Sequence, residues 1–111
     1  MDTALRNARV PVGSHSDNRA TLRKAVQLDA RVRDRGSSRF KIKVVDLSMT
    51  GFRAETAFTV RPGSLVWINL PGLMGLEAEI AWQRGEHIGA AFRQALHPAV
   101  FDHIVALSRQ G

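Results

Sequence analysis

The sequence predicts a mainly all-β fold, a sandwich or small barrel of six strands, followed by one helix. Six short segments show apolar alternation or a β-branched bias, and turn residues separate them. The final segment, after Pro98, instead has apolar residues at helical spacing. The 111-residue length is that of one domain, and a composition 44% hydrophobic and 23% charged is that of a globular protein.

The elements follow in order along the chain. Residues 1–18 show neither the alternation of a strand nor the apolar spacing of a helix, and they mix Pro, Gly, Ser, Asp and Asn with isolated apolar residues. We therefore expect a flexible N-terminal arm at residues 1–18, followed by a domain at residues 19–111. The expected strands lie at residues 26–33, 40–44, 52–55, 65–71, 76–83 and 88–92. The expected helix begins at Pro98, and its apolar face should cover an open end of a barrel.

Charge is concentrated at one end of the chain. The net charge is +6, but it is unevenly distributed. Residues 1–45 hold eleven Lys or Arg and four acids, whereas residues 46–111 hold five Lys or Arg and six acids. Thirteen of the sixteen basic residues are Arg, whose planar fork binds phosphate or a guanine edge. The composition therefore favours an anionic partner.

Other classes of protein are disfavoured. The absence of Cys excludes disulfides, thiolate metal sites and thiol nucleophiles. No apolar run approaches the roughly 20 residues that span a bilayer, and the N-terminus lacks the apolar stretch of a secretion signal. We therefore expect a cytoplasmic protein without membrane insertion.

The stretch "DLSMTG" carries a first motif where the second strand ends. Asp46, Ser48 and Gly51 form a DxSxxG pattern, and alternation places Asp46 and Ser48 together on the outer face. Because Lys41 and Lys43 occupy the same outer face, a register break must lie near residues 44–45. A purely structural interpretation is also open, in which Asp and Ser bond local backbone and Gly51 supplies a positive φ.

A second motif lies upstream, where Arg19 and Arg23 form an RxxxR pattern in "NRATLRKAV". In this order, with the later stretches "GFRAET", "RPGSLVWINLPG" and "AEIAWQRGEHIGAAFR", the two motifs resemble the PilZ domain, a bacterial receptor module for cyclic di-GMP. The resemblance runs from Arg19 to Leu107. It departs from many family members in having Asp17 and Asn18, rather than further arginines, before the first motif.

The resemblance implies a six-stranded antiparallel β-barrel of PilZ type with one C-terminal helix. It also implies a cyclic di-GMP site without cofactor or metal, formed by Arg19, Arg23, Asp46, Ser48 and Gly51. The chemistry fits, because arginine matches phosphate or guanine O6 and N7, and a carboxylate accepts from guanine N1 and N2. We expect the arm to order around the ligand and signal to an effector protein that the sequence does not identify.

Several other residues are not expected to contact the ligand. Lys24, Arg53 and Arg9 are expected to be solvated surface charges rather than ligand contacts, and Trp67 and Trp82 are expected to belong to the core. Gly89 is expected to allow two backbones to approach each other closely.

Three alternatives to a cyclic di-GMP receptor differ in the residues that they require. An enzyme is disfavoured because the four histidines, His15, His87, His97 and His103, lack metal-ligand spacing, and no nucleophile elbow or phosphate-binding glycine loop is present. A ligand-independent PilZ-like adaptor remains open. A basic barrel that binds nucleic acid is less favoured, because the aromatic residues mostly occupy positions expected to face inward.

Overall fold

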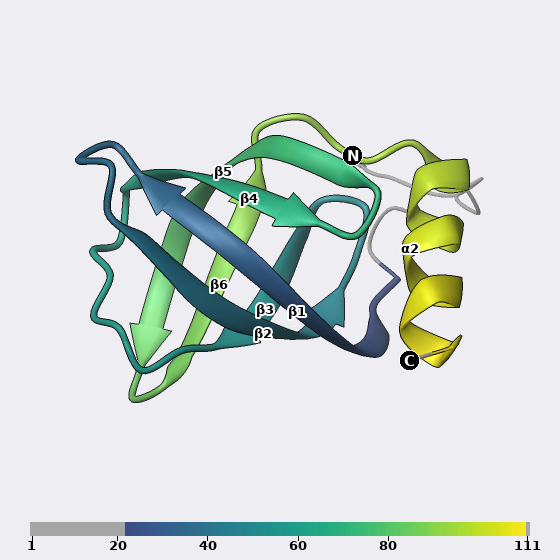
Figure 1. The fold of residues 1–111 in the computed structure, drawn as a ribbon, viewed down its shortest axis with the longest axis horizontal. Coiled ribbons are helices and arrows are strands. Elements are labelled where there is room, and N and C mark those ends of the chain that lie inside the picture. The colour runs from purple at the N-terminus through teal and green to yellow at the C-terminus, as the bar shows by residue number, and fades with distance from the viewer. Residues whose placement is uncertain (1–21, 111) are drawn as a thin grey trace, which may run out of the picture.

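The computed structural model describes residues 22–110, which form six strands and a helix (Figure 1). The elements are β1 (Lys24–Asp34), β2 (Arg39–Leu47), β3 (Gly51–Glu55), β4 (Leu65–Leu70), β5 (Leu73–Arg84), β6 (His87–Phe92) and α2 (Pro98–Gln110). The arm predicted at residues 1–18 lies outside the described residues.

The strands form a closed barrel in the order β1-β2-β3-β6-β5-β4, and all neighbouring pairs are antiparallel. This confirms the six-stranded antiparallel barrel, and it decides between the barrel and the sandwich. Closure depends on β4, which pairs with β1 between Arg31 and Asp34. Within residues 22–110, no helix is both long and apolar enough to cross a membrane.

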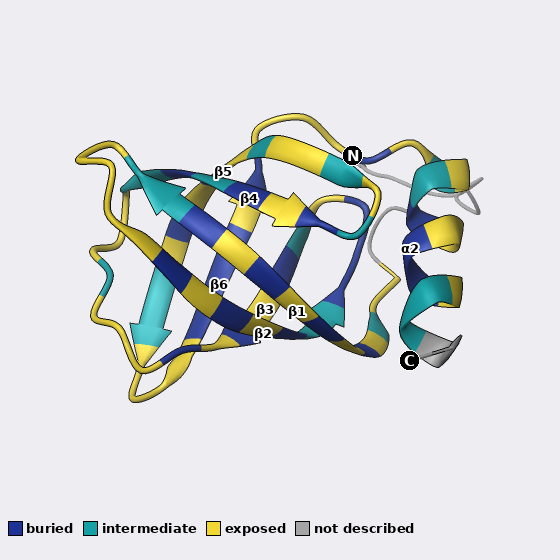
Figure 2. Ribbon diagram, in the orientation of Figure 1, coloured by how far each residue is buried: buried dark blue, intermediate teal, exposed yellow. Residues whose placement is uncertain are grey.

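The core fills the barrel because each strand alternates between buried and exposed residues (Figure 2). On β1, Val26, Leu28, Ala30 and Val32 are all at most 5% exposed, and the intervening residues face the solvent or the outer surface. Burial of such apolar surface contributes about 25 cal/mol per Å². This period of two is the signal that made the strands predictable from the sequence.

Helix α2 lies across one end of the barrel, as predicted (Figure 1). Its Phe101, Ile104 and Val105 belong to the same hydrophobic core as the inward residues of the strands. The Gln27 backbone N–H of β1 donates to Ser108 Oγ at 2.9 Å, which fixes the last turns of the helix against the start of β1.

The segment that leads into α2 is attached to the β2–β3 turn. Leu96 is buried, and its backbone N–H donates to the Met49 carbonyl at 2.7 Å. The Phe92 N–H, at the end of β6, donates to the Thr50 carbonyl at 2.9 Å. The turn that carries the first sequence motif is therefore held from both sides by the chain that runs from β6 to the helix.

Candidate functional site

The barrel brings the described parts of the two motifs together. β1 pairs with β2 so that Ala25 lies opposite Asp46. Arg23 stands two residues before Ala25, so it lies beside the end of β2, where Ser48 follows. Arg23 is exposed, and Arg19 lies outside the described residues. The antiparallel hairpin thus places one arginine of RxxxR next to the DxSxxG turn.

A β-bulge sets the direction of Asp46. The β2–β3 register shifts between Val44 and Asp46, which confirms the predicted break. Val44 and Leu47 are fully buried, whereas Val45 and Asp46 are only partly buried. The extra residue lets the strand present Asp46 on the outer surface while Val44 and Leu47 remain in the core.

Asp46 forms an ion pair with Arg53, so the prediction that Arg53 is only a solvated surface charge is wrong. Arg53 lies directly opposite Asp46 on β3, and its NH2 group is 3.0 Å from Asp46 Oδ2. The Arg53 side chain is 44% exposed, so this ion pair stabilises the fold by at most about 1 kcal/mol. Its main effect is to orient the carboxylate. The signal was available in the sequence, because a tight β2–β3 hairpin places the two residues opposite each other.

The Ser48 side chain does not point outward with Asp46, so that part of the prediction is wrong. Ser48 is 7% exposed, and its Oγ accepts the backbone N–H groups of Thr50 at 3.2 Å and Gly51 at 3.1 Å. The Ser48 N–H also donates to the Gly51 carbonyl at 2.9 Å. Strand alternation ends at Leu47, and Ser48 folds back to build the turn.

Replacing Ser48 with Ala should therefore lower the free energy of unfolding by about 1–2 kcal/mol, because two backbone donors lose their acceptor in a partly buried turn. Thermal denaturation followed by circular dichroism would measure the loss. Thr59→Ala, at an exposed position in the β3–β4 connection, is the control and should leave the melting temperature nearly unchanged. Equal melting of the Ser48→Ala protein and the parent would contradict the role assigned to the hydroxyl.

Gly51 is required by packing and does not have the positive φ of the structural interpretation. A Cβ built on Gly51 would lie 2.3 Å from the Ala90 carbonyl oxygen of β6. The glycine therefore lets β3 lie close against β6 at the start of their pairing, where Gly51 lies opposite Ala91.

A row of outer-surface residues runs across four strands from Asp46. Asp46 lies opposite Arg53, Arg53 opposite Gly89, and Gly89 opposite Trp82. A Cβ on Gly89 would lie 2.3 Å from the Trp82 indole, so Gly89 makes room for a side chain, and the expected approach of two backbones is wrong. A register shift between Ile80 and Trp82 turns the indole outward, which simple alternation could not predict.

Both tryptophans lie partly exposed on the outer surface, so their assignment to the core is wrong. Trp67 stands between Val66 and Ile68, which are 2% and 0% exposed, and alternation turns it outward. The continuous apolar run around it hid this alternation in the sequence. The Arg33 guanidinium carbon lies 4.5 Å from the centre of the Trp67 ring.

Two hollows lie on the outer wall of the barrel in the described part of the chain. One hollow, of about 320 Å³, lies over β1, β2 and β3 and is lined in part by Asp29, Lys43 and Glu55. A second, of about 390 Å³, lies over β1, β2 and β4. Neither Asp46 nor Ser48, Gly51 or Arg23 lines either hollow.

Comparisons with known proteins agree with this fold. Among solved structures, the chain is similar to the crystal structure of the PilZ domain of CeSA from a cellulose-synthesizing bacterium, with a TM-score of 0.58 and 16% sequence identity. The match covers 81% of this chain and 97% of that one. At this identity the likeness establishes the fold, a small barrel closed by a helix. No curated protein matches the sequence.

The family model for the PilZ domain matches residues 17–110, and the chain belongs to the PilZ domain family. PilZ domains are in general receptors for cyclic di-GMP and act as binding or adaptor domains rather than as enzymes.

Proposed function

We propose that this domain is a non-catalytic receptor for cyclic di-GMP that binds the dinucleotide where β1, β2 and β3 meet. The observation that carries the proposal is the β1–β2 register, which places Arg23 beside the end of β2 and the β2–β3 turn, the stretch that carries Asp46, Ser48 and Gly51. These are the two motifs, RxxxR and DxSxxG, in which the sequence resembles PilZ domains that hold this ligand. Arg19, four residues before Arg23, completes the proposed site.

Arg19 and Arg23 would supply the cationic half of the site. Cyclic di-GMP carries two phosphates and two guanines, and an arginine fork can pair with a phosphate or with O6 and N7 of guanine. Arg23 is exposed at the start of the barrel, so its guanidinium is available to a ligand that settles on the outer surface.

Asp46 would read a guanine edge. Its Oδ2 is already held by Arg53, but a carboxylate offers about four lone-pair sites, so it can keep this ion pair and still accept from guanine N1 and N2. Ser48 and Gly51 would act by shaping the corner, since the hydroxyl bonds the turn and the glycine lets β3 meet β6.

Trp82 offers an aromatic surface further along the same row. Adjacent strands lie about 4.8 Å apart, so three strand steps separate Asp46 from Trp82 by roughly 14 Å, and the indole reaches back over Gly89. A purine held at Asp46 leaves the rest of a dinucleotide free to extend along this row and stack on the indole. Ligand binding should therefore change tryptophan fluorescence.

The direct test is calorimetric titration of the full chain with cyclic di-GMP, with GTP and linear dinucleotide as controls. We expect saturable heat with the cyclic compound and much weaker heat with both controls. The ligand should be recovered unchanged, because the proposed site holds it without chemistry. A folded protein that gives no heat with cyclic di-GMP would overturn the receptor and favour a ligand-independent adaptor.

Asp46→Ala should reduce discrimination between guanine and other bases more than it reduces overall charge attraction. Removing the base-reading acceptor should narrow the preference for cyclic di-GMP over cyclic di-AMP by about 1–3 kcal/mol. Competition titrations with the two cyclic dinucleotides measure this difference. Glu79→Ala, which removes an exposed acid from β5, is the matched control. An unchanged preference in Asp46→Ala would remove Asp46 from the base-reading role.

A further inference from the structure

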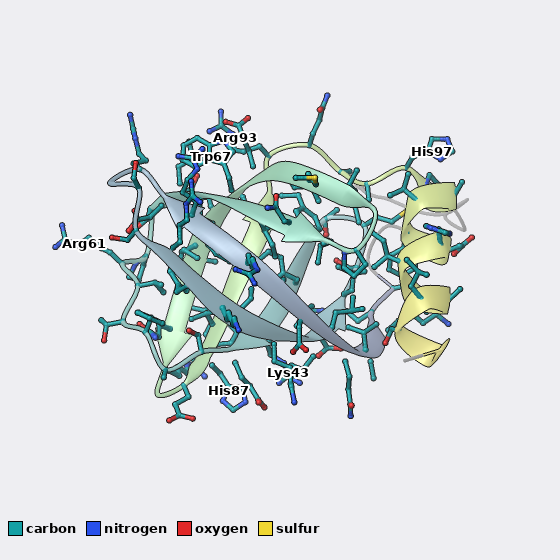
Figure 3. All side chains as sticks on the ribbon, viewed as in Figure 1. Lys43, Arg61, Trp67, His87, Arg93 and His97 are labelled. Carbon is teal, nitrogen blue, oxygen red and sulfur yellow. The ribbon has the colours of Figure 1, made fainter. Side chains whose placement is uncertain are left out.

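A second surface lies toward the opposite ends of β1 and β2 from the proposed cyclic di-GMP site. It is a hollow of about 390 Å³ on the outer face of β1, β2 and β4, here named the basic groove. Its charged and polar lining residues are Arg31, Arg33, Arg39, Lys41 and Asn69, and its aromatic lining residues are Phe40 and Trp67. In Figure 3, Trp67 lies away from the end of the barrel that α2 covers.

The basic groove concentrates positive charge at an energetic cost. Arg31 lies directly opposite Lys41, and Arg33 lies directly opposite Arg39. Like charges directly opposite each other destabilise a sheet. None of these four cations belongs to the ion pairs that the described side chains form at Asp46–Arg53 and Glu55–His87, and no acid lines the groove. An anionic partner would relieve this repulsion.

The groove is also partly preorganised. The Arg33 guanidinium lies over the Trp67 ring at 4.5 Å, which restricts its orientation. The Asn69 side-chain oxygen accepts the Gly75 backbone N–H at 2.7 Å, which fixes the start of β5 at the rim. Met74, next to Gly75, is 79% exposed, so an apolar side chain stands beside the charged surface.

These residue types favour a protein partner. Arg, Trp and Met are enriched in protein–protein interfaces. One face of the Trp67 indole is already occupied by Arg33, which leaves less of the ring free for the base stacking typical of single-stranded nucleic-acid sites. Alternate residues of a strand repeat at roughly 6.7 Å, so Arg31 and Arg33 match alternate carboxylates of an extended peptide.

We propose that the basic groove docks an acidic, extended segment of a partner protein. The Arg forks and Lys41 bind its carboxylates, and the apolar side chain of Met74 contacts the segment beside them. This docking surface is distinct from the residues proposed to bind cyclic di-GMP, and it stands whether or not that ligand binds.

The test measures binding of the full chain to a short fluorescent peptide of alternating glutamate and serine, with glutamine in place of glutamate as the control peptide. We expect the acidic peptide to bind and the glutamine control peptide not to bind. Arg39→Glu should weaken it about tenfold or more, the loss typical of a charged hydrogen bond. Arg61→Glu makes the same change in net charge at an exposed position outside the groove and should change affinity less than about twofold.

A measurement of thermal stability distinguishes loss of the docking surface from unfolding of the Arg39→Glu protein. Arg39→Glu converts the like-charged pair with Arg33 into an opposite-charged pair, so its melting temperature at low salt should equal or exceed that of the parent. Failure of the acidic peptide to bind, or an equal loss in Arg61→Glu, would overturn the proposal. Oligothymidylate that binds more tightly than the peptide, with the same dependence on Arg39, would also overturn it and assign the groove to nucleic acid.

Discussion

Gly51→Ala should lower the free energy of unfolding by about 3 kcal/mol, near the upper end of the cost of overpacking. The added Cβ would lie 2.3 Å from the Ala90 carbonyl oxygen and 3.2 Å from the Ala91 Cα. Both atoms belong to the backbone of β6, so neither can rotate away, and the β3–β6 pairing must open. Urea denaturation followed by circular dichroism would measure the loss as a lower transition midpoint with an unchanged slope.

Gly89→Ala is the control for this prediction, because its added Cβ meets a side chain instead of backbone. The nearest atoms belong to the Trp82 indole, which can turn about its own torsions into solvent. We expect a smaller loss of stability and a red-shifted tryptophan emission, since the displaced indole becomes more exposed. If Gly51→Ala unfolded at the same urea concentration as the parent, the close contact between β3 and β6 would not be a constraint on the fold.

Arg23→Ala should weaken cyclic di-GMP binding by about 1.5–3 kcal/mol, roughly 10- to 150-fold, the range for loss of a hydrogen bond to a charged group. Arg23 is exposed and precedes β1, so the melting temperature should remain close to that of the parent. Calorimetric titration would give both the affinity and the heat of binding.

Arg61→Ala serves as the charge-matched control, because the substitution removes the same unit of charge as Arg23→Ala. Arg61 is exposed in the loop between β3 and β4 (Figure 3). Its effect on affinity should stay within a few tenths of a kcal/mol, as expected for a remote surface charge. If the Arg23→Ala protein bound cyclic di-GMP as tightly as the parent, Arg23 would not contact the ligand, even if the receptor function held.

The strands and the helix were predictable because each follows a local period. Val26 to Val32 and Phe40 to Val44 alternate cleanly, and the apolar spacing after Pro98 is helical. The bulge near residue 44 could also be predicted, because Lys43 and Asp46 both had to face outward around a buried Val44. Local pattern and global fold agree in these segments.

The remaining features depend on contacts that are distant in sequence. Trp82 was assigned to the core because it stands two residues after the buried Ile80, and the register shift that turns it outward exists only in the pairing with β6. The constraint on Gly51 comes from Ala90, thirty-nine positions later. The orientation of Ser48 depends on a turn that replaces strand alternation. No local period in the sequence reports such contacts.

The pairing of β4 with β1 has a consequence for how this domain can be recognised. Because the sheet of residues 24–92 closes on itself, each of its strands has a hydrogen-bonded neighbour on both sides, and no whole strand edge is left as a template for backbone pairing. A strand added by another protein, as happens at the edges of open sheets, therefore has no complete edge to pair with here. A protein that binds the wall of the barrel must therefore recognise its outward side chains, where a single substitution can change the choice of partner while leaving the barrel intact.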